Sequence, residues 1–379
     1  MNDGRRKLLR QIAIKDGSRL HFGTRAPVTK PGGLHGVIRG MAAGQSSLGL
    51  SPVIIDEIAH PKSLSSRLDL GLGEIGLEPV VEYTNAYKGP LLEFHFSQTV
   101  NDVLRESRLR DIPRIMHFHG PWGREGLVQG NHALRACVKT LIERKAYKRF
   151  ELFTTHSTAF KALLVNDFGI QARAVRVIYP GIDTKRFSPG HMMKARGRLG
   201  LPLDEFIFVS IRRLEPRMGL DLAITALAKL PSGHLAIAGD GSSRSALEQL
   251  AKELGVSKRV TFLGRLPDSA VADLYRSGNC AIVPTRALEG FGLVVLESFS
   301  CGTPVISANI GGLPEAMGPW AAEWTFEPGN ASALQTKMQD SMNGVVPCSS
   351  DLIAYSGENS WDGVARKIED YVTESLMTC

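Results

Sequence analysis

The sequence is poor in cysteine and contains no long apolar run. Its five cysteines are scattered over 379 residues without any C-x-x-C pair, which argues against a zinc site and a disulfide framework. Few, unpaired cysteines are typical of a reducing compartment, so we expect a cytoplasmic protein. No apolar run approaches the ~20 residues that span a bilayer. The basic segment 1–10 lacks the following apolar core of a secretory signal.

Positive charge is concentrated in the first half of the chain. The net charge is +7, and residues 1–185 hold 27 Lys and Arg against 17 Asp and Glu. The densest cluster lies at helical spacing in residues 135–149, where Glu143 is the single acid. This segment is either a solvated helix face or a surface for anionic lipid headgroups or a phosphorylated acceptor, which would place the protein peripherally at the inner face of the membrane. We expect no nucleic-acid partner, because aromatic interleaving and C2H2 spacing are lacking.

Short apolar runs alternate with helical patterns along the whole chain, which predicts an α/β fold with parallel sheets covered on both faces. In the first half the predicted strands are 19–23, 52–56, 91–96, 114–119, 152–156 and 175–179, with helices at 97–106 and 131–149. In the second half the predicted strands are 206–211, 234–238, 260–263, 280–284 and 304–307, with helices at 220–230, 245–254, 268–277 and 293–300.

This alternation predicts two Rossmann-like, doubly wound domains. The turn-rich stretch 179–190 is the expected linker, so we divide the chain into residues 1–186 and 187–360. Residues 361–379 form an amphipathic helix that could return to the first domain. Open α/β sheets bind ligands at the carboxyl ends of their strands, so we expect the site in a central cleft that the two domains face.

Two segments could hold phosphate. Gly32 and Gly33 follow the first strand, where a glycine pair is either a structural turn or a loop that leaves helix N–H groups open to an anion. Arg212, Arg213 and Arg217 follow a strand of the second half and could clamp a diphosphate in fork geometry. The alternative for the arginines is a surface position.

The richest pattern is the segment Glu289-Gly-Phe-Gly-Leu-Val-Val-Leu-Glu297. Here a strand ends, a loop with two glycines follows, and a helix begins near Leu293. Such amides at a helix start suit the negative charge of a diphosphate. Glu289 and Glu297 could bond vicinal hydroxyls of an elongated ligand, or serve as a helix cap and a solvated residue.

Histidines end two of the predicted strands. His117 and His119 point to the same face of their strand, since side chains alternate with period two. No carboxylate or cysteine stands at ligand spacing, so we expect no metal. His119 opens onto a loop and is expected to bond a ligand, whereas His95 and His117 are expected to be structural histidines.

Taken in order, these motifs resemble the retaining glycosyltransferase family 4, which has the GT-B fold. The resemblance rests on an E-x7-E motif at Glu289 and Glu297 and covers nearly the whole chain. The other matching segments are Pro31–Gly33, His119–Gly120, Val177–Asp183, Arg213–Leu214, Ala238–Gly241, Val260–Gly264 and Ser360–Trp361.

The resemblance implies transfer of a hexosyl unit from a UDP- or GDP-linked sugar to an acceptor hydroxyl, with retained anomeric configuration and neither cofactor nor metal. The acceptor would be a saccharide, a lipid-linked molecule or a small molecule bound by the first domain. By position, His119 and Glu289 would contact the transferred sugar, and Glu297 would bond the ribose. The implied donor-binding residues are Gly32, Gly33, Arg213, Arg217, Gly264, Arg265, Gly290, Phe291, Gly292 and Leu293.

One position departs from the family pattern. Met218 stands before Gly219 where the family usually has a lysine, so Arg217 or Arg212 would have to neutralise the phosphate. Two alternative functions remain open at the level of the sequence. They are a sugar-nucleotide epimerase of the same fold and a non-catalytic relative that binds nucleotide sugars.

Overall fold

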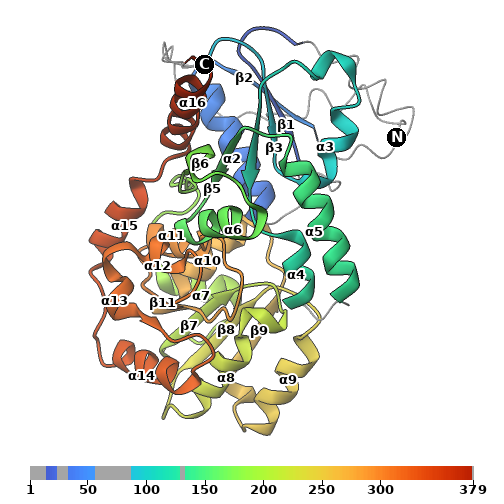
Figure 1. Ribbon diagram of the computed structural model, residues 1–379. Helices are drawn as coiled ribbons and strands as arrows, with labels where there is room; N and C mark the ends of the chain where they lie inside the picture. The colour runs from blue at the N-terminus through green and yellow to red at the C-terminus, as the bar shows by residue number, and fades with distance from the viewer. Residues whose placement is uncertain (1–13, 24–32, 56–86, 129–132, 378–379) are drawn as a thin grey trace, which may run out of the picture. The chain divides into compact units, whose positions relative to one another are not determined.

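The computed structural model describes residues 14–23, 33–55, 87–128 and 133–377. The chain divides into two compact units (Figure 1). The first combines residues up to Leu127, Asn131–Gly181 and Asn359–Cys379, and the second consists mainly of Ile182–Glu358. The division at 181/182 lies five residues before the boundary predicted from the turn-rich linker.

The first unit is built on a parallel six-stranded sheet in the order β2-β1-β3-β4-β5-β6. Its strands are β1 (Ser18–Phe22), β2 (Ser51–Ile55), β3 (Leu91–Phe94), β4 (Arg114–Phe118), β5 (Leu152–Thr155) and β6 (Val175–Val177). Its main helices are α2 (Gly33–Ser47), α3 (Ser97–Val103), α4 (Trp122–Val128), α5 (Ala133–Tyr147), α6 (Thr158–Phe168) and α16 (Trp361–Met377).

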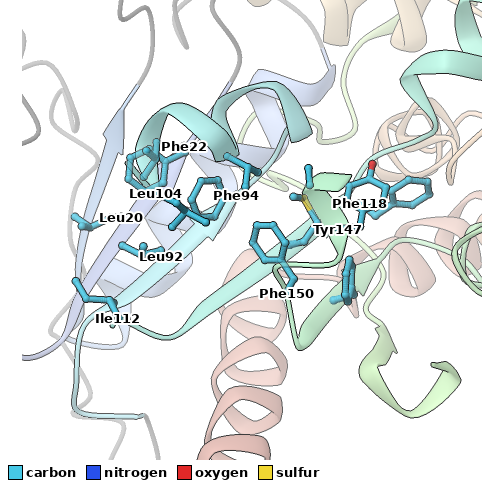
Figure 2. Packing of buried hydrophobic residues seen from close by; sticks show 14 of the residues in the cluster. Leu20, Phe22, Leu92, Phe94, Leu104, Ile112, Phe118, Tyr147 and Phe150 are labelled. Carbon is cyan, nitrogen blue, oxygen red and sulfur yellow. The ribbon is translucent and has the colours of Figure 1, made fainter. Parts of the chain in front are cut away.

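Aromatic and aliphatic side chains of β1, β3, β4 and β5 form the main core of this unit with α3 and α5 (Figure 2). Phe94 stacks on Phe22 with ring centroids 4.9 Å apart and meets the edge of Phe150. Removing such rings from water stabilises a fold by about 25 cal/mol per Å² of apolar surface. The core therefore holds the strands in register and fixes where their carboxyl ends emerge.

Helix α16 packs on α2 although the two are far apart in the sequence. The ring of Trp361 lies directly over Gly40, where a Cβ would come within 2.1 Å of it, so only glycine fits. Deeper in, Arg19 of β1 donates to both carboxylate oxygens of Glu369 at 2.8 and 2.6 Å, and neither side chain is exposed. A buried ion pair thus connects α16 to β1.

The second unit repeats the architecture with the strand order β12-β11-β10-β7-β8-β9, again all parallel. Its strands are β7 (Ile207–Ile211), β8 (His234–Ala238), β9 (Val260–Gly264), β10 (Cys280–Val283), β11 (Val305–Ala308) and β12 (Thr325–Phe326). Its helices include α7 (Met192–Leu199), α8 (Leu220–Ala228), α9 (Arg244–Glu253), α10 (Asp268–Ser277), α11 (Leu293–Ser300), α12 (Leu313–Met317), α13 (Ala321–Trp324), α14 (Ala331–Met342) and α15 (Ser349–Gly357).

The two doubly wound α/β sheets confirm the predicted fold class, and most predicted elements agree with the structure within three residues. The predicted helix 97–106 was too long, because α3 ends at Val103 and a single 3-10 turn follows at Ser107–Leu109. Helices α4, α6, α7 and α12–α15 were not predicted, since several are short or weakly amphipathic. No helix in the described part of the chain is long and apolar enough to cross a membrane.

Candidate functional site

The sheet of the second unit reverses its winding direction between β7 and β10. From β7 the chain proceeds through β8 to β9 on one side, and then returns to β10 and β11 on the other. The loops that follow β7 and β10 therefore diverge at the carboxyl ends of these two strands, and open α/β sheets bind their ligands at such a reversal point. We call the edge between these two loops the crevice. Arg212 and Arg213 follow β7, and the Glu289 loop follows β10.

Arg212 joins the two diverging loops. Its buried guanidinium donates to the carboxylate of Glu289 and to the hydroxyl of Thr285. A charge-assisted bond of this kind is stronger than one between neutral groups and orients both partners. Glu289 is thus held at the mouth of the crevice with its carboxylate engaged by Arg212.

The backbone of the Glu289 loop packs closely against Gly312, which follows β11. Gly312 donates its N–H to the carbonyl of Glu289 at 3.0 Å, and a Cβ on Gly312 would approach the Gly290 oxygen to 2.4 Å. Leu288 adopts a φ of 54°, which is unusual for a residue with a side chain. The loop is therefore held in a strained form beside the crevice, a feature that often marks ligand sites.

Arg217 belongs to the support of this loop. It is buried, and its guanidinium donates to the carbonyl oxygens of Leu288 and Ala287 at 3.1 and 3.4 Å. Met218, the residue in place of the family's lysine, is also buried. Arg213, in contrast, has an exposed side chain beside the crevice.

Glu297 lies in α11 and faces α10. The hydroxyl of Tyr275 donates to its carboxylate at 2.7 Å. Burial raises the pKa of Glu297, and the bond from Tyr275 opposes the shift. Between Glu289 and Glu297 lie the buried Phe291 and Gly292, whose φ of 94° lets the chain turn into the helix. The sequence spacing thus places one carboxylate in the glycine loop and the other one turn into the helix that follows.

Two further predicted donor residues stand at the end of β9. Gly264 has a φ of 67° and accepts a hydrogen bond from the N–H of Gly239 at 2.7 Å, which ties the ends of β8 and β9 together. Arg265 follows with an exposed side chain. Both lie at the carboxyl edge of the same sheet as Arg213.

The first unit has its own reversal point, between β1 and β3. Gly33 is the first residue of α2 there, whereas Gly32 lies outside the described residues. His119 follows β4 and is partly buried. Its Nε2 lies 2.9 Å from Nδ1 of His95, and its Nδ1 lies 3.0 Å from Nε2 of His156. Any ligand hydroxyl that bonds this ring must therefore replace a neighbouring histidine.

His95 and His117 are buried and hydrogen-bonded, as predicted for structural histidines. His117 contacts the carboxylate of Glu93 at 2.9 Å. Burial by itself raises the pKa of Glu93, but His21 and His117 outweigh it and lower the pKa to about 2. The described residues contain no group of three His, Cys, Asp or Glu side chains arranged to hold a metal ion.

Sequence reasoning missed several members of these clusters. Thr285 and Tyr275 gave no local signal, because their bonds with Arg212 and Glu297 arise only through the fold. Gly311-Gly312 after β11 is a glycine pair like the one after β1 and could have been found. His21 and His156 also sit at or near strand ends and could have been grouped with the other strand histidines.

The comparisons with known proteins agree with this architecture. A model described as Glycosyltransferase Family 4 matches residues 32–186, and one described as Glycosyl transferases group 1 matches residues 192–349. Together they span most of the chain.

Two relatives have the name D-inositol 3-phosphate glycosyltransferase. The protein from Acidothermus cellulolyticus is 39% identical over 167 residues, which are 41% of this chain and 37% of the relative. The protein from Mycobacterium avium is 36% identical over 218 residues, which are 53% of this chain and 51% of the relative. The matches thus span about half the length of these relatives or less.

Two solved structures share the fold of this chain. Sucrose-phosphate synthase from Thermosynechococcus elongatus has a TM-score of 0.76 at 19% identity, covering 96% of this chain and 100% of its own. Anabaena HepE in complex with UDP-glucose has a TM-score of 0.71 at 20% identity and the same coverage. At such identities the likeness establishes the two-domain GT-B architecture.

Proposed function

We propose that this chain, which belongs to family 4 of the glycosyltransferases, transfers a hexosyl unit from a nucleoside diphosphate sugar to an acceptor hydroxyl with retention of configuration. The observation that carries the proposal is the crevice of the second unit, where one glycine loop presents Glu289 and Glu297 on either side of a helix start. Backbone amides at such a start favour a diphosphate, and carboxylates favour sugar hydroxyls.

In this proposal the second unit binds the donor. Glu297 bonds the ribose, Glu289 bonds hydroxyls of the donor sugar, and the amides of Gly290–Leu293 face the diphosphate. Arg213 follows β7 with an exposed side chain and neutralises the phosphates. Arg217 contributes by holding the loop, because its guanidinium is engaged with loop carbonyls. No metal or cofactor is part of this scheme.

The first unit contributes Gly33 and His119 and selects the acceptor. His119 contacts the transferred sugar near the reacting carbon, and the departing phosphate assists the incoming hydroxyl. The bound UDP-glucose of HepE makes uridine donors the first choice for a test. The name of the inositol phosphate relatives adds a phosphorylated polyol to the acceptors considered, which are saccharides, lipid-linked molecules and small molecules.

The experiment is a thermal-shift panel of UDP- and GDP-sugars on the full chain, followed by product analysis with and without acceptors. If the chain is a retaining transferase, one donor should raise its melting temperature specifically. The product should have the same anomeric configuration as that donor. Acceptor-independent conversion of one nucleotide sugar into another would identify an epimerase instead. Stabilisation without any turnover would identify a non-catalytic binding protein, and no shift with any nucleotide sugar would contradict the proposal.

A membrane-facing role for α5 also belongs to the proposal. Leu134, Val138 and Leu141 are 76%, 49% and 57% exposed, and they recur at the spacing of one helix face. Basic residues of segment 135–149 flank them, which is the pattern of a helix that lies in an anionic lipid interface. Sedimentation with phosphatidylglycerol vesicles should capture the chain, and Leu141→Gln should weaken the capture. Equal capture of both proteins would exclude this helix as the contact.

A further inference from the structure

Four histidines of the first unit form one continuous hydrogen-bonded chain across the carboxyl ends of β1, β3, β4 and β5. Nδ1 of each ring faces Nε2 of the next, at 3.0 Å from His21 to His95, 2.9 Å from His95 to His119 and 3.0 Å from His119 to His156. Adjacent ring centroids are 4.9 to 5.3 Å apart. We call this the histidine chain.

Both ends of the histidine chain meet an oxygen that can only accept. At one end Nδ1 of His156 lies 3.2 Å from the carbonyl oxygen of Ile178. At the other end Nε2 of His21 lies 2.7 Å from Oε1 of Gln45. The orientation of that amide is fixed by its other group, because Nε2 of Gln45 lies 2.6 Å from a carboxylate oxygen of Glu93. Reversing the amide would bring two acceptors together there.

The number of protons follows from this geometry. Five hydrogen bonds run from Gln45 through the four rings to Ile178, and each needs one N–H. A neutral imidazole carries one N–H, so four neutral rings supply four. Two acceptors that face each other without a proton leave a bond unmade, which is most costly at the buried His21 end, so the chain needs one additional proton.

The balance of buried charge requires the same proton. Glu93 is fully buried, and it accepts hydrogen bonds from Gln45 and His117. The neighbouring cation Arg19 is engaged by both oxygens of Glu369, so that pair is neutral. A buried carboxylate without a cation is strongly destabilising.

Two histidines lie near the carboxylate of Glu93, His117 with Nε2 at 2.9 Å and His21 with Nδ1 at 3.7 Å. The hydroxyl of Thr154 can donate to Nδ1 of a neutral His117, so His117 needs no second proton, whereas the histidine chain does and brings it to His21.

Only one proton fits. The hydrogen-bond count places the proton at His21 although burial lowers the pKa of that ring, because Glu93 opposes the lowering there. Burial lowers the pKa values of His95 and His119 further, and no carboxylate compensates for it. Two positive rings at such separations would repel each other strongly. Glu143 of α5 lines the same small cavity as His119, but the N–H groups of Trp122 and Gly123 bind its carboxylate.

We propose that the histidine chain holds one proton beyond its four neutral rings, that Glu93 keeps this proton at His21, and that His119 is thereby fixed as a neutral ring protonated at Nδ1. In this arrangement His119 donates to His156 and accepts from His95. The proton can also reach His119 without any ring rotation. Two successive shifts suffice, from Nδ1 of His21 to Nε2 of His95 and then from Nδ1 of His95 to Nε2 of His119.

The consequence for the reaction rests on the proposed function. A glycosyl centre gains positive charge as its bond to the leaving group breaks. A charged ring at His119 would oppose that change. A neutral ring can meet a sugar hydroxyl with a donor at Nδ1 in place of His156, or with an acceptor at Nε2 in place of His95. Glu93 and His21 would then act as positioning residues, because they set the state of His119 without touching substrate.

The test needs no substrate, so its failure is distinguishable from failure of the transferase proposal. The full chain without a histidine tag is labelled with ¹⁵N-histidine, and two-bond ¹H–¹⁵N spectra are recorded at pH 8. We expect His21 alone among the ten histidines to show the doubly protonated signature at this pH, where free histidine is almost entirely neutral. The signals are assigned by single His→Gln variants, and a doubly protonated His117 in place of His21 would contradict the proposal. His119 should show the Nδ1–H tautomer.

The decisive variant is Glu93→Gln, and its matched control is Glu143→Gln, a buried carboxylate of the same unit that accepts from two backbone N–H groups and the hydroxyl of Tyr147. The doubly protonated signal should disappear in Glu93→Gln and persist in Glu143→Gln. The reverse outcome would overturn the assignment of Glu93. A wild-type spectrum at pH 8 with only neutral histidines would overturn the proton count, and this measurement decides even if Glu93→Gln does not fold.

Discussion

The two units share one architecture but place their charges differently. Each has a six-stranded parallel sheet with a single reversal point. In the first unit the charged groups are inside, where Arg19 pairs with Glu369 and Glu93 faces the histidine chain. In the second unit they stand in the strand-end loops, where Arg212 holds Glu289. The topology thus fixes where a ligand can bind, and the distribution of charge decides which unit is sensitive to protonation and which one is open to an anionic ligand.

The largest expected effect tests the buried charge of the first unit. Arg19→Leu leaves Glu369 buried without its cation, so we expect the first unit to lose about 3–5 kcal/mol of stability. The matched control is Arg176→Leu, because Arg176 also pairs with a glutamate of α16, Glu374, but the two side chains are 51% and 63% exposed. It should cost about 0–1 kcal/mol. Hydrogen exchange of β1 and α16 measures both, and equal losses would contradict the contrast.

The second prediction tests the loop charges of the second unit. Removing a bond to a charged group costs about 1.5–3 kcal/mol, so Glu297→Ala should weaken the binding of the matching nucleoside diphosphate roughly tenfold to a hundredfold. Calorimetry measures the dissociation constant. Glu323→Ala is the control, since Glu323 is an exposed acid of the same unit. An unchanged dissociation constant for Glu297→Ala would remove this residue from the site.

The third prediction separates the units by pH. Burial lowers the pKa of His156 to about 4. This ring therefore stays neutral in the folded first unit between pH 6.5 and 4, whereas in the unfolded chain it binds a proton below about pH 6.5. The free energy of unfolding of the first unit is therefore highest above pH 6.5. It falls between pH 6.5 and 4 by about 1.4 kcal/mol per pH unit for each such proton. Hydrogen exchange at pH 7.5, 5.5 and 4.5 should show that the unfolding free energy falls more steeply in the first unit than in the second. His156→Gln should reduce the slope by one proton, and an unchanged slope would refute the assignment.

The smallest effect concerns the orientation of Glu297. Tyr275→Phe removes the hydroxyl that donates to this carboxylate but keeps the buried ring. We expect a loss of roughly 0.5–1.5 kcal/mol in nucleotide binding, which is smaller than the loss in Glu297→Ala. The same titration distinguishes the two variants. A loss as large as that of Glu297→Ala would mean that the tyrosine itself contacts the ligand.

Much of this arrangement could be predicted because its causes are local. Strand and helix periods gave the doubly wound fold, and the glycine loop between Glu289 and Glu297 gave a helix start flanked by carboxylates. The pairing of Arg212 with Glu289 could not be predicted, since 77 residues separate them in sequence and only the neighbouring positions of β7 and β10 bring them together. Arg217 was predicted as a phosphate ligand, and its contacts with loop carbonyls became visible only in the structure.

The sequence by itself determined the two α/β units and the order of the motifs along them, because hydrophobic period and glycine position act within a few residues. Only the tertiary structure decided that histidines from four strands form a single chain with Glu93 beside it. Hydrogen-bond partners and buried charges are set by parallel strands that lie side by side but are distant in sequence. The proton count of such a chain depends on both of its ends at once, and no local pattern contains that information.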